Sequence, residues 1–140
     1  MGAWVLKTAP GSTPVGALAA ASLRGLTSRC VRRSYRTALM EPGQAVLLWV
    51  SGRDPHTPAG IHARGRITGV PEPTSDDDPR RLEVALQLEP VDPPVLRADL
   101  LADPVLSRIE VIRMPAGSNP SYLTREELAC LRELLTVVDD

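Results

Sequence analysis

The sequence contains no phenylalanine and only four aromatic residues, which are Trp4, Tyr35, Trp49 and Tyr122. Leucine, valine, isoleucine and alanine must therefore build the core. An indole or phenol in such a chain is of most use where it does something an aliphatic group cannot do, such as stacking on a base or contacting a cation. We expect Trp4, in a first strand, to be a core residue. Trp49 and Tyr35 are candidates for ligand contacts.

Cysteine and histidine are also scarce. Cys30 and Cys130 lie too far apart for a paired zinc motif and do not form a disulfide framework. His56 and His62 have neither of the short spacings of a metal-binding pair. The phosphate-binding loop, the nucleophile elbow and the dinucleotide fingerprint are all absent. We therefore expect no metal, no cofactor and no enzymatic activity; an enzyme with Cys30 as nucleophile is the third alternative.

Long apolar runs are missing as well. No window approaches the roughly 18 apolar residues that a membrane span needs, and the opening "MGAWVLKTAPG" lacks the basic region of a signal peptide. We expect no membrane association and a cytoplasmic location. The length of 140 residues predicts one domain, residues 1–140.

The net charge of −1 conceals an uneven distribution. Residues 1–69 contain nine basic and two acidic residues, a net charge of +7, whereas residues 70–140 contain seven basic and fifteen acidic residues, a net charge of −8. A basic half favours an anionic partner. The alternative is that the two halves neutralise each other in the fold.

Alternation of apolar and polar residues predicts strands at 3–9, 60–68 and 81–89, the last one ended by Pro90, Pro93 and Pro94. The continuous apolar run 45–51 predicts a strand buried on both faces, and 41–44 predicts a turn. In strand 60–68 the pattern places His62, Arg64 and Arg66 on the polar face. We expect a helix at 15–26, two short helical turns at 96–103 and 104–109, and a last strand at 110–114.

The C-terminal helix has the clearest signals. Thr124 and Glu127 have the spacing of a capping box, and Leu123 and Leu128 that of a hydrophobic staple. An apolar stripe at helical spacing then predicts that the helix packs on the core. Mixed strands with helices at the margins, without regular alternation, predict an α+β fold around a curved or barrel-like sheet.

Four stretches together resemble the EVE domain family, which is related to YTH domains. They are "AWVLKTAP", "MEPGQAVLLWVSG", "PAGIHARGRITG" and "RMPAGSNPSYLTREELACL". Lys7 and Thr8 match the Lys-Ser pair of that family, and Trp49 and Ser51 match its aromatic-x-Ser strand end. Ala9 stands where many relatives have an acidic residue, and residues 25–34 lack the tryptophan that relatives often carry there.

The resemblance implies a PUA-like fold, a curved β-barrel with flanking helices, and recognition of a base, modified or unmodified, in RNA or DNA. The leading hypothesis is a non-catalytic nucleic-acid-binding module. Its base pocket would use Trp49, Ser51, Lys7, Thr8, Tyr35 and Asn119. Its phosphate contacts would come from Arg29, Arg32, Arg33, Arg36, Arg64 and Arg66. The alternative is an adaptor of the same fold that binds a protein or a small ligand.

Overall fold

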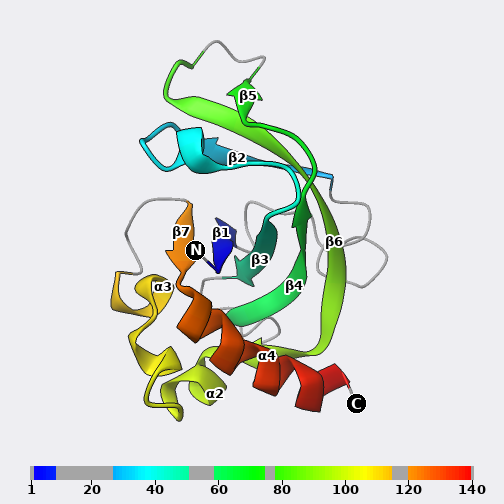
Figure 1. The fold of residues 1–140 in the computed structure, drawn as a ribbon, viewed down its shortest axis with the longest axis vertical. Coiled ribbons are helices and arrows are strands. Elements are labelled where there is room, and N and C mark those ends of the chain that lie inside the picture. Colours follow the sequence, from blue (N-terminus) through cyan, green and yellow to red (C-terminus); the bar gives the residue numbers. More distant parts are fainter. Residues whose placement is uncertain (1, 9–26, 51–58, 75–77, 115–119, 140) are drawn as a thin grey trace.

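The computed structural model describes residues 2–8, 27–50, 59–74, 78–114 and 120–139 (Figure 1). The strands are β1 Ala3–Thr8, β2 Ser28–Arg32, β3 Ala45–Val50, β4 Gly60–Ile67, β5 Glu72–Pro73, β6 Arg81–Leu96 and β7 Ser121–Leu123. The helices are α2 Arg97–Leu101, α3 Glu110–Arg113 and α4 Arg125–Asp139, with short 3₁₀ helices η2 Thr37–Leu39 and η3 Leu106–Arg108. The helix expected at 15–26 lies outside the described residues.

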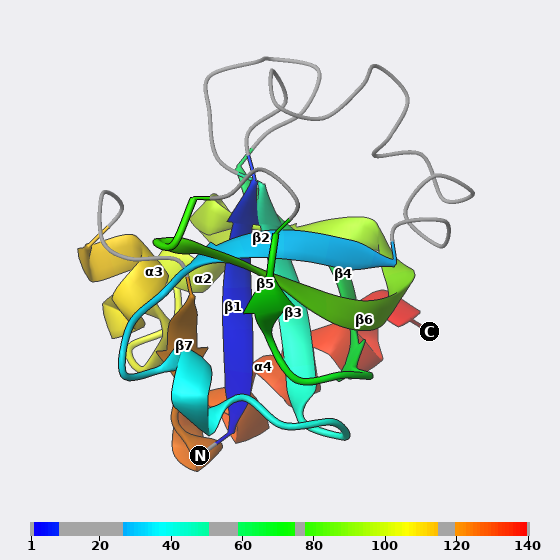
Figure 2. The ribbon, with the colours of Figure 1, turned by 90° about the horizontal axis from the view of Figure 1, so that it is seen from above.

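One strongly curved sheet organises these elements. Its strand order is β2-β6-β4-β3-β1-β7, with β5 paired to β6. Strands β1 and β3 are parallel, and the other pairs are antiparallel. Figures 1 and 2 show that the long strand β6 bends, so that β2 crosses over β1 and β3 while the helices gather at the opposite end. The α+β fold around a curved sheet is confirmed.

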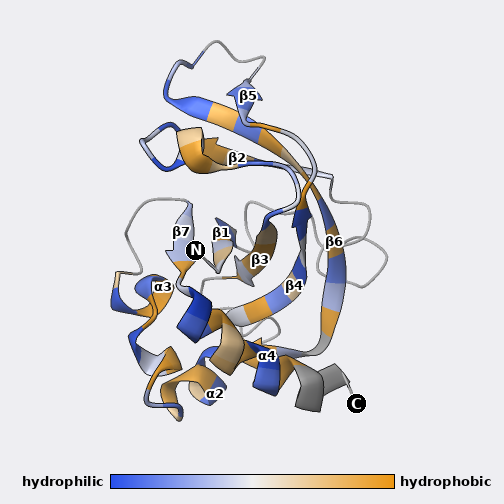
Figure 3. Ribbon diagram, in the orientation of Figure 1, coloured by the Kyte–Doolittle hydropathy of each residue, from blue (hydrophilic) through white to orange (hydrophobic). Residues whose placement is uncertain are grey.

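The sheet separates two hydrophobic clusters. The inner cluster lies between β1, β3 and β4 on one side and β2 with the first half of β6 on the other. The outer cluster lies between the sheet and the helices. In β3, Leu48 belongs to the inner cluster and Trp49 to the outer one, which explains the continuous apolar run of this strand. In Figure 3, β3 is accordingly hydrophobic along most of its length.

Two expectations about β4 and β6 were wrong. Strand β6 passes through the prolines and ends only at Leu96. The ladder between β4 and β6 jumps there, because Ile61 pairs with Val95 but Ala63 pairs with Pro90. An irregularity of this kind tolerates prolines, which lack the N–H that a regular ladder needs. His62 sits at the same irregularity and is buried rather than on the exposed polar face.

The last strand expected at 110–114 was also wrong. These residues form the short helix α3, closed by backbone hydrogen bonds from Arg113 N to Ile109 O (3.0 Å) and from Met114 N to Glu110 O (2.8 Å). Ile109 and Val111 are both buried in the outer cluster. Two buried apolar residues that are two positions apart fit either a strand or a single helical turn. The short apolar run therefore could not distinguish a strand from a helix here.

The features expected of α4 are confirmed. Thr124 N donates to Glu127 Oε1 (2.9 Å), and Glu127 N donates to Thr124 Oγ1 (3.1 Å), which completes the capping box. Leu128, Leu131 and Leu135 are buried in the outer cluster. The same cluster holds Leu123 of the staple and, at its edge, Cys130. Helix α4 therefore lies across the outer face of the sheet (Figure 1).

The turn at 41–44 and Trp4 form one structural unit. Gly43 has φ 93°, a left-handed conformation that favours glycine. Trp4 is 2% exposed, and its Nε1 donates to Gln44 Oε1 (2.7 Å). The same oxygen accepts from Glu41 N (2.8 Å). The core role expected for Trp4 is confirmed, and its indole N–H ties the first strand to the turn.

Candidate nucleic-acid interface

Four arginines converge on a groove beside β2, which we call the arginine groove. Its volume is about 470 Å³, and it is lined by Arg29, Cys30, Val31, Arg32, Asp78, Arg80 and Arg81. The pairing of β2 with β6 sets Arg32 directly opposite Arg81. Like charges in directly opposed positions destabilise a strand pair. Asp78, the one acidic residue in this lining, lies 3.7 Å from Arg80. The groove is therefore suited to an anionic ligand.

Arg29 adds a second sign of an anion site. Its Nε is buried without a hydrogen-bond partner among the described residues. Burial also lowers the pKa of the Arg29 guanidinium below its ordinary range. A buried N–H without an acceptor costs about 1–3 kcal/mol, and an anionic oxygen would remove this cost.

Arg33 lies beside the groove, and Tyr35 follows it closely in the chain. The backbone N–H of Arg33 donates to Arg80 O (2.7 Å), and its Nε donates to Pro79 O (2.8 Å), so Arg33 lies beside the groove residues. Tyr35, two residues further on, is 74% exposed. The hydroxyl of Tyr35 accepts a hydrogen bond from Arg36 Nε (3.2 Å).

Arg36 lies elsewhere and has a structural role. Its guanidinium forms a two-pronged ion pair with Glu110 of α3, in which Nη2 donates to Oε2 at 2.8 Å. Its Nη1 also donates to Pro120 O (3.2 Å), and the ring centres of Tyr35 and Tyr122 lie 5.8 and 5.4 Å away. The hydrogen bond from Arg36 is the main reason that the pKa of Glu110 is lowered. Arg36 thus joins the segment after β2 to α3 and β7.

The residues expected to form a base pocket are only partly described. The parallel pairing of β1 and β3 places Lys7 opposite Trp49 and Thr8 opposite Val50, so the two matched motifs lie side by side. Trp49 is 4% exposed and packed in the outer cluster. Ser51, Asn119 and the side chain of Thr8 lie outside the described part of the chain.

Lys7 is turned toward α3. Its Nζ donates to Met114 O (3.4 Å), and burial lowers the pKa of its amine, an effect that the charge of Glu110 partly offsets. Together with the Arg36 contact to Pro120, this bond means that basic side chains hold the chain on both sides of residues 115–119.

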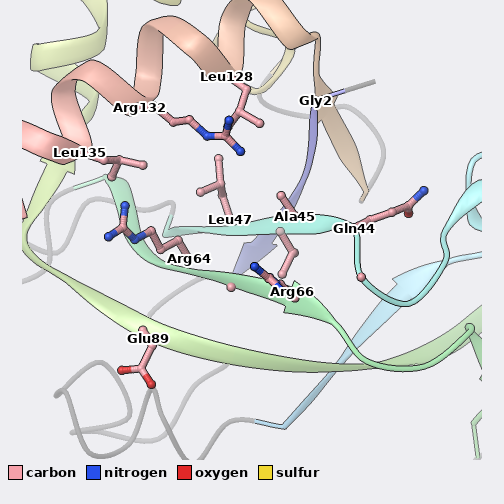
Figure 4. Close-up of a pocket in the computed structure, with 13 residues that line it drawn as sticks. Gly2, Gln44, Ala45, Leu47, Arg64, Arg66, Glu89, Leu128, Arg132 and Leu135 are labelled. Carbon is pink, nitrogen blue, oxygen red and sulfur yellow. The ribbon is translucent and has the colours of Figure 1, made fainter.

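Arg64 and Arg66 line a different groove, which we call the α4 groove. Its volume is about 940 Å³, and its lining comes from β3, β4, β6, α4 and the chain near Gly2 and Gly43. Figure 4 shows Arg132 reaching from α4 toward Leu47, with Arg64 and Arg66 on the strand beside it and Glu89 on the side away from the helix.

The predicted arginines therefore separate into three places. Arg29, Arg32 and Arg33 gather at the arginine groove, Arg36 pairs with Glu110, and the arginines of β4 lie in the α4 groove. Sequence reasoning missed Arg80, Arg81 and Arg132. Arg80 immediately precedes the alternating strand and Arg81 is its first residue, and this position was their one signal. Arg132 lies on the exposed face of a helix, where a charge is ordinary.

Among the described residues, no group of histidine, cysteine or acidic side chains is arranged to hold a metal ion. In the same part of the chain, no helix is long and apolar enough to cross a membrane.

Comparisons with known proteins show likeness in structure alone. No family model matches the chain, and no curated protein matches it. The structure is similar to Rpa0253 from Rhodopseudomonas palustris, with a TM-score of 0.74 and 15% identity, covering 98% of this chain and 94% of that one. Protein Atu2648 from Agrobacterium tumefaciens has a TM-score of 0.72 and 16% identity, covering 99% and 93%. The DUF55 domain of human thymocyte nuclear protein 1 has a TM-score of 0.68 and 16% identity, covering 95% and 98%.

These likenesses establish the fold: the chain is an α+β protein with a PUA-like curved β-barrel and flanking helices. Membership of the EVE family remains a prediction from the sequence motifs.

Proposed function

We propose that this protein is a non-catalytic nucleic-acid-binding module, and that the arginine groove receives the phosphate backbone of a single strand. The observation that carries the proposal is the register of β2 and β6, which sets Arg32 opposite Arg81 inside a groove lined by two further arginines. Guanidinium groups bind phosphate oxygens through paired hydrogen bonds.

Tyr35 supports the proposal because it offers an exposed ring for base stacking three residues along the chain from Arg32. A ring that is 74% exposed can stack on a base of any sequence, whereas a buried one cannot. In this arrangement the arginines position the backbone and Tyr35 contacts the base. The base pocket that the family resemblance implies, at the paired ends of β1 and β3, would be a separate and more selective contact.

The salt dependence of binding tests the proposal. If all four arginines of the groove contact phosphates, the logarithm of the association constant should fall with the logarithm of salt concentration with a slope of about −2.8 for a single strand. A fourfold rise in salt then weakens binding about 50-fold. In the variant with both Arg32→Ala and Arg81→Ala, the slope should fall to about −1.4 and the loss to about sevenfold.

Fluorescence anisotropy with labelled single-stranded RNA and DNA provides the measurement. Arg125→Ala is the matched control, because Arg125 is exposed on α4 and lines neither groove. The absence of binding at low salt to both nucleic acids would refute the function. Binding with an unchanged slope in the double variant would instead refute the assignment of the groove.

A further inference from the structure

The α4 groove differs from the arginine groove in its surroundings and in its place in the molecule. It lies at the helical end of the fold, whereas β2 lies at the other end in Figure 1. Its volume of about 940 Å³ is near the upper limit of sites that bind drug-sized ligands. It therefore has room for several consecutive residues of a peptide.

The charges of the α4 groove face each other across its width. Arg64 and Arg66 are exposed on one face of β4, and residues two apart on a strand are separated by about 6.8 Å. Arg132 approaches from the helix on the opposite wall (Figure 4). With Glu89 as the one acidic residue in the lining, the side chains of the groove sum to a net charge of +2. An acidic ligand is complementary to this lining.

The apolar part of the lining distinguishes between acidic ligands. Ala45 and Leu47 on β3 and Leu128 and Leu135 on α4 are aliphatic, and no aromatic side chain is among the described residues that line the groove. Without a ring for stacking, the groove offers little to a nucleic-acid base. Aliphatic surface and the hydrocarbon stems of arginines suit aliphatic side chains.

We propose that the α4 groove binds an acidic peptide segment of a partner protein, in extended conformation, with aliphatic residues between its carboxylates. Successive side chains on one face of an extended peptide repeat at about 6.8 Å, the spacing of the two arginines on β4. Carboxylates on that face pair with Arg66 and, beside its cross-strand neighbour Glu89, with Arg64. The aliphatic residues between them face Leu128 and Leu135 of α4.

The test uses a fluorescein-labelled peptide that alternates glutamate with leucine, titrated with the full chain in fluorescence polarisation. We expect saturable binding at low salt that weakens at about 0.15 M salt, because the contacts are exposed ion pairs. Arg66→Ala and Arg132→Ala should each weaken binding about tenfold. Both arginines are exposed, so the variants should keep the melting temperature of the wild type.

Arg125→Ala is the control on the same helix and should bind the peptide like the wild type. A peptide with lysine in place of glutamate should not bind. The proposal is overturned if the acidic peptide does not bind at low salt, or if the two groove variants bind it as tightly as Arg125→Ala. It is equally overturned if Arg66→Ala and Arg132→Ala weaken oligonucleotide binding and leave peptide binding unchanged, since the groove would then belong to the nucleic-acid surface.

Discussion

Replacing Arg36 with methionine separates a structural role for this arginine from the phosphate contact that its sequence neighbourhood predicts. The substitution keeps an apolar stem but removes the two hydrogen bonds to Glu110 and the bond to Pro120 O. Removing the guanidinium charge also removes its cation–π contacts with the rings of Tyr35 and Tyr122. Glu110 then remains partly buried without its cation.

The expected cost follows from the burial of the pair. Removing one partner of a fully buried ion pair costs about 3–5 kcal/mol. The side chains of Arg36 and Glu110 retain 16% and 15% of their exposure, so water compensates part of the loss. We expect a decrease of about 2–3 kcal/mol in the free energy of unfolding, and for a chain of this size a decrease of about 6–9 °C in the melting temperature.

A double-mutant cycle with Glu110→Gln isolates the interaction. Since both single variants break the same pair, the double variant should be less destabilised than the sum of the two by about 1 kcal/mol or more. Urea denaturation supplies the free energies, and the oligonucleotide titration is run on the same proteins. The salt dependence of nucleic-acid binding should not change in Arg36→Met.

The pair also predicts a pH dependence. Arg36 lowers the pKa of Glu110 in the folded protein below its ordinary value of 4.5. The ionised carboxylate therefore stabilises the fold above pH 4.5, and this contribution is lost as the pH falls through the lowered pKa. The stability difference between the wild type and Glu110→Gln should be constant near neutral pH and should shrink below about pH 4.5. An unchanged melting temperature in Arg36→Met, together with a weaker salt dependence of nucleic-acid binding, would show that Arg36 binds phosphate and that the pair does not support the fold.

Two further substitutions test the interior of the fold. Trp49→Ala should lower the free energy of unfolding by about 3–5 kcal/mol in urea denaturation, because the ring is packed in the outer cluster. A stable Trp49→Ala protein that loses only base-dependent binding would place this residue in a ligand pocket instead. Gly65→Ala should prevent folding, as judged by circular dichroism, because a Cβ at this position would lie 1.7 Å from Gln87 O. Gly69→Ala is its control, since there the added atom meets the Ala85 Cβ at an ordinary 3.4 Å. Comparable stability of the two glycine variants would contradict this reasoning.

Sequence patterns correctly predicted the elements that are specified by residues close together in the chain. The capping box of α4 depends on two side chains three residues apart, and the turn at 41–44 depends on a glycine that tolerates a positive φ. The sequence predicted the alternating first half of strand β6, but it wrongly ended the strand at the prolines. The reason is that the ladder irregularity opposite His62, which accommodates the prolines, involves a strand distant in sequence.

The candidate sites could be predicted less well. The sequence indicated an arginine-rich segment, and the structure places Arg29 and Arg32 in the lining of one groove, because neighbours on a short strand stay close. It could not indicate that Arg81 lies opposite Arg32, since that depends on the register of β2 with β6. Nor could it separate Arg36 from its neighbours, because the ion pair joins residues 74 positions apart.

By itself, the sequence determined that the core is aliphatic, that strands with helices at the margins form an α+β fold, and that the basic residues lie mostly in the first half. These properties follow from composition and from spacings of a few residues. Only the tertiary structure decided which arginines face an acid, which face one another and that Trp49 is enclosed as well as Trp4. Coulombic energy and desolvation depend on distance and burial in space, and the order of residues along the chain specifies neither of them directly.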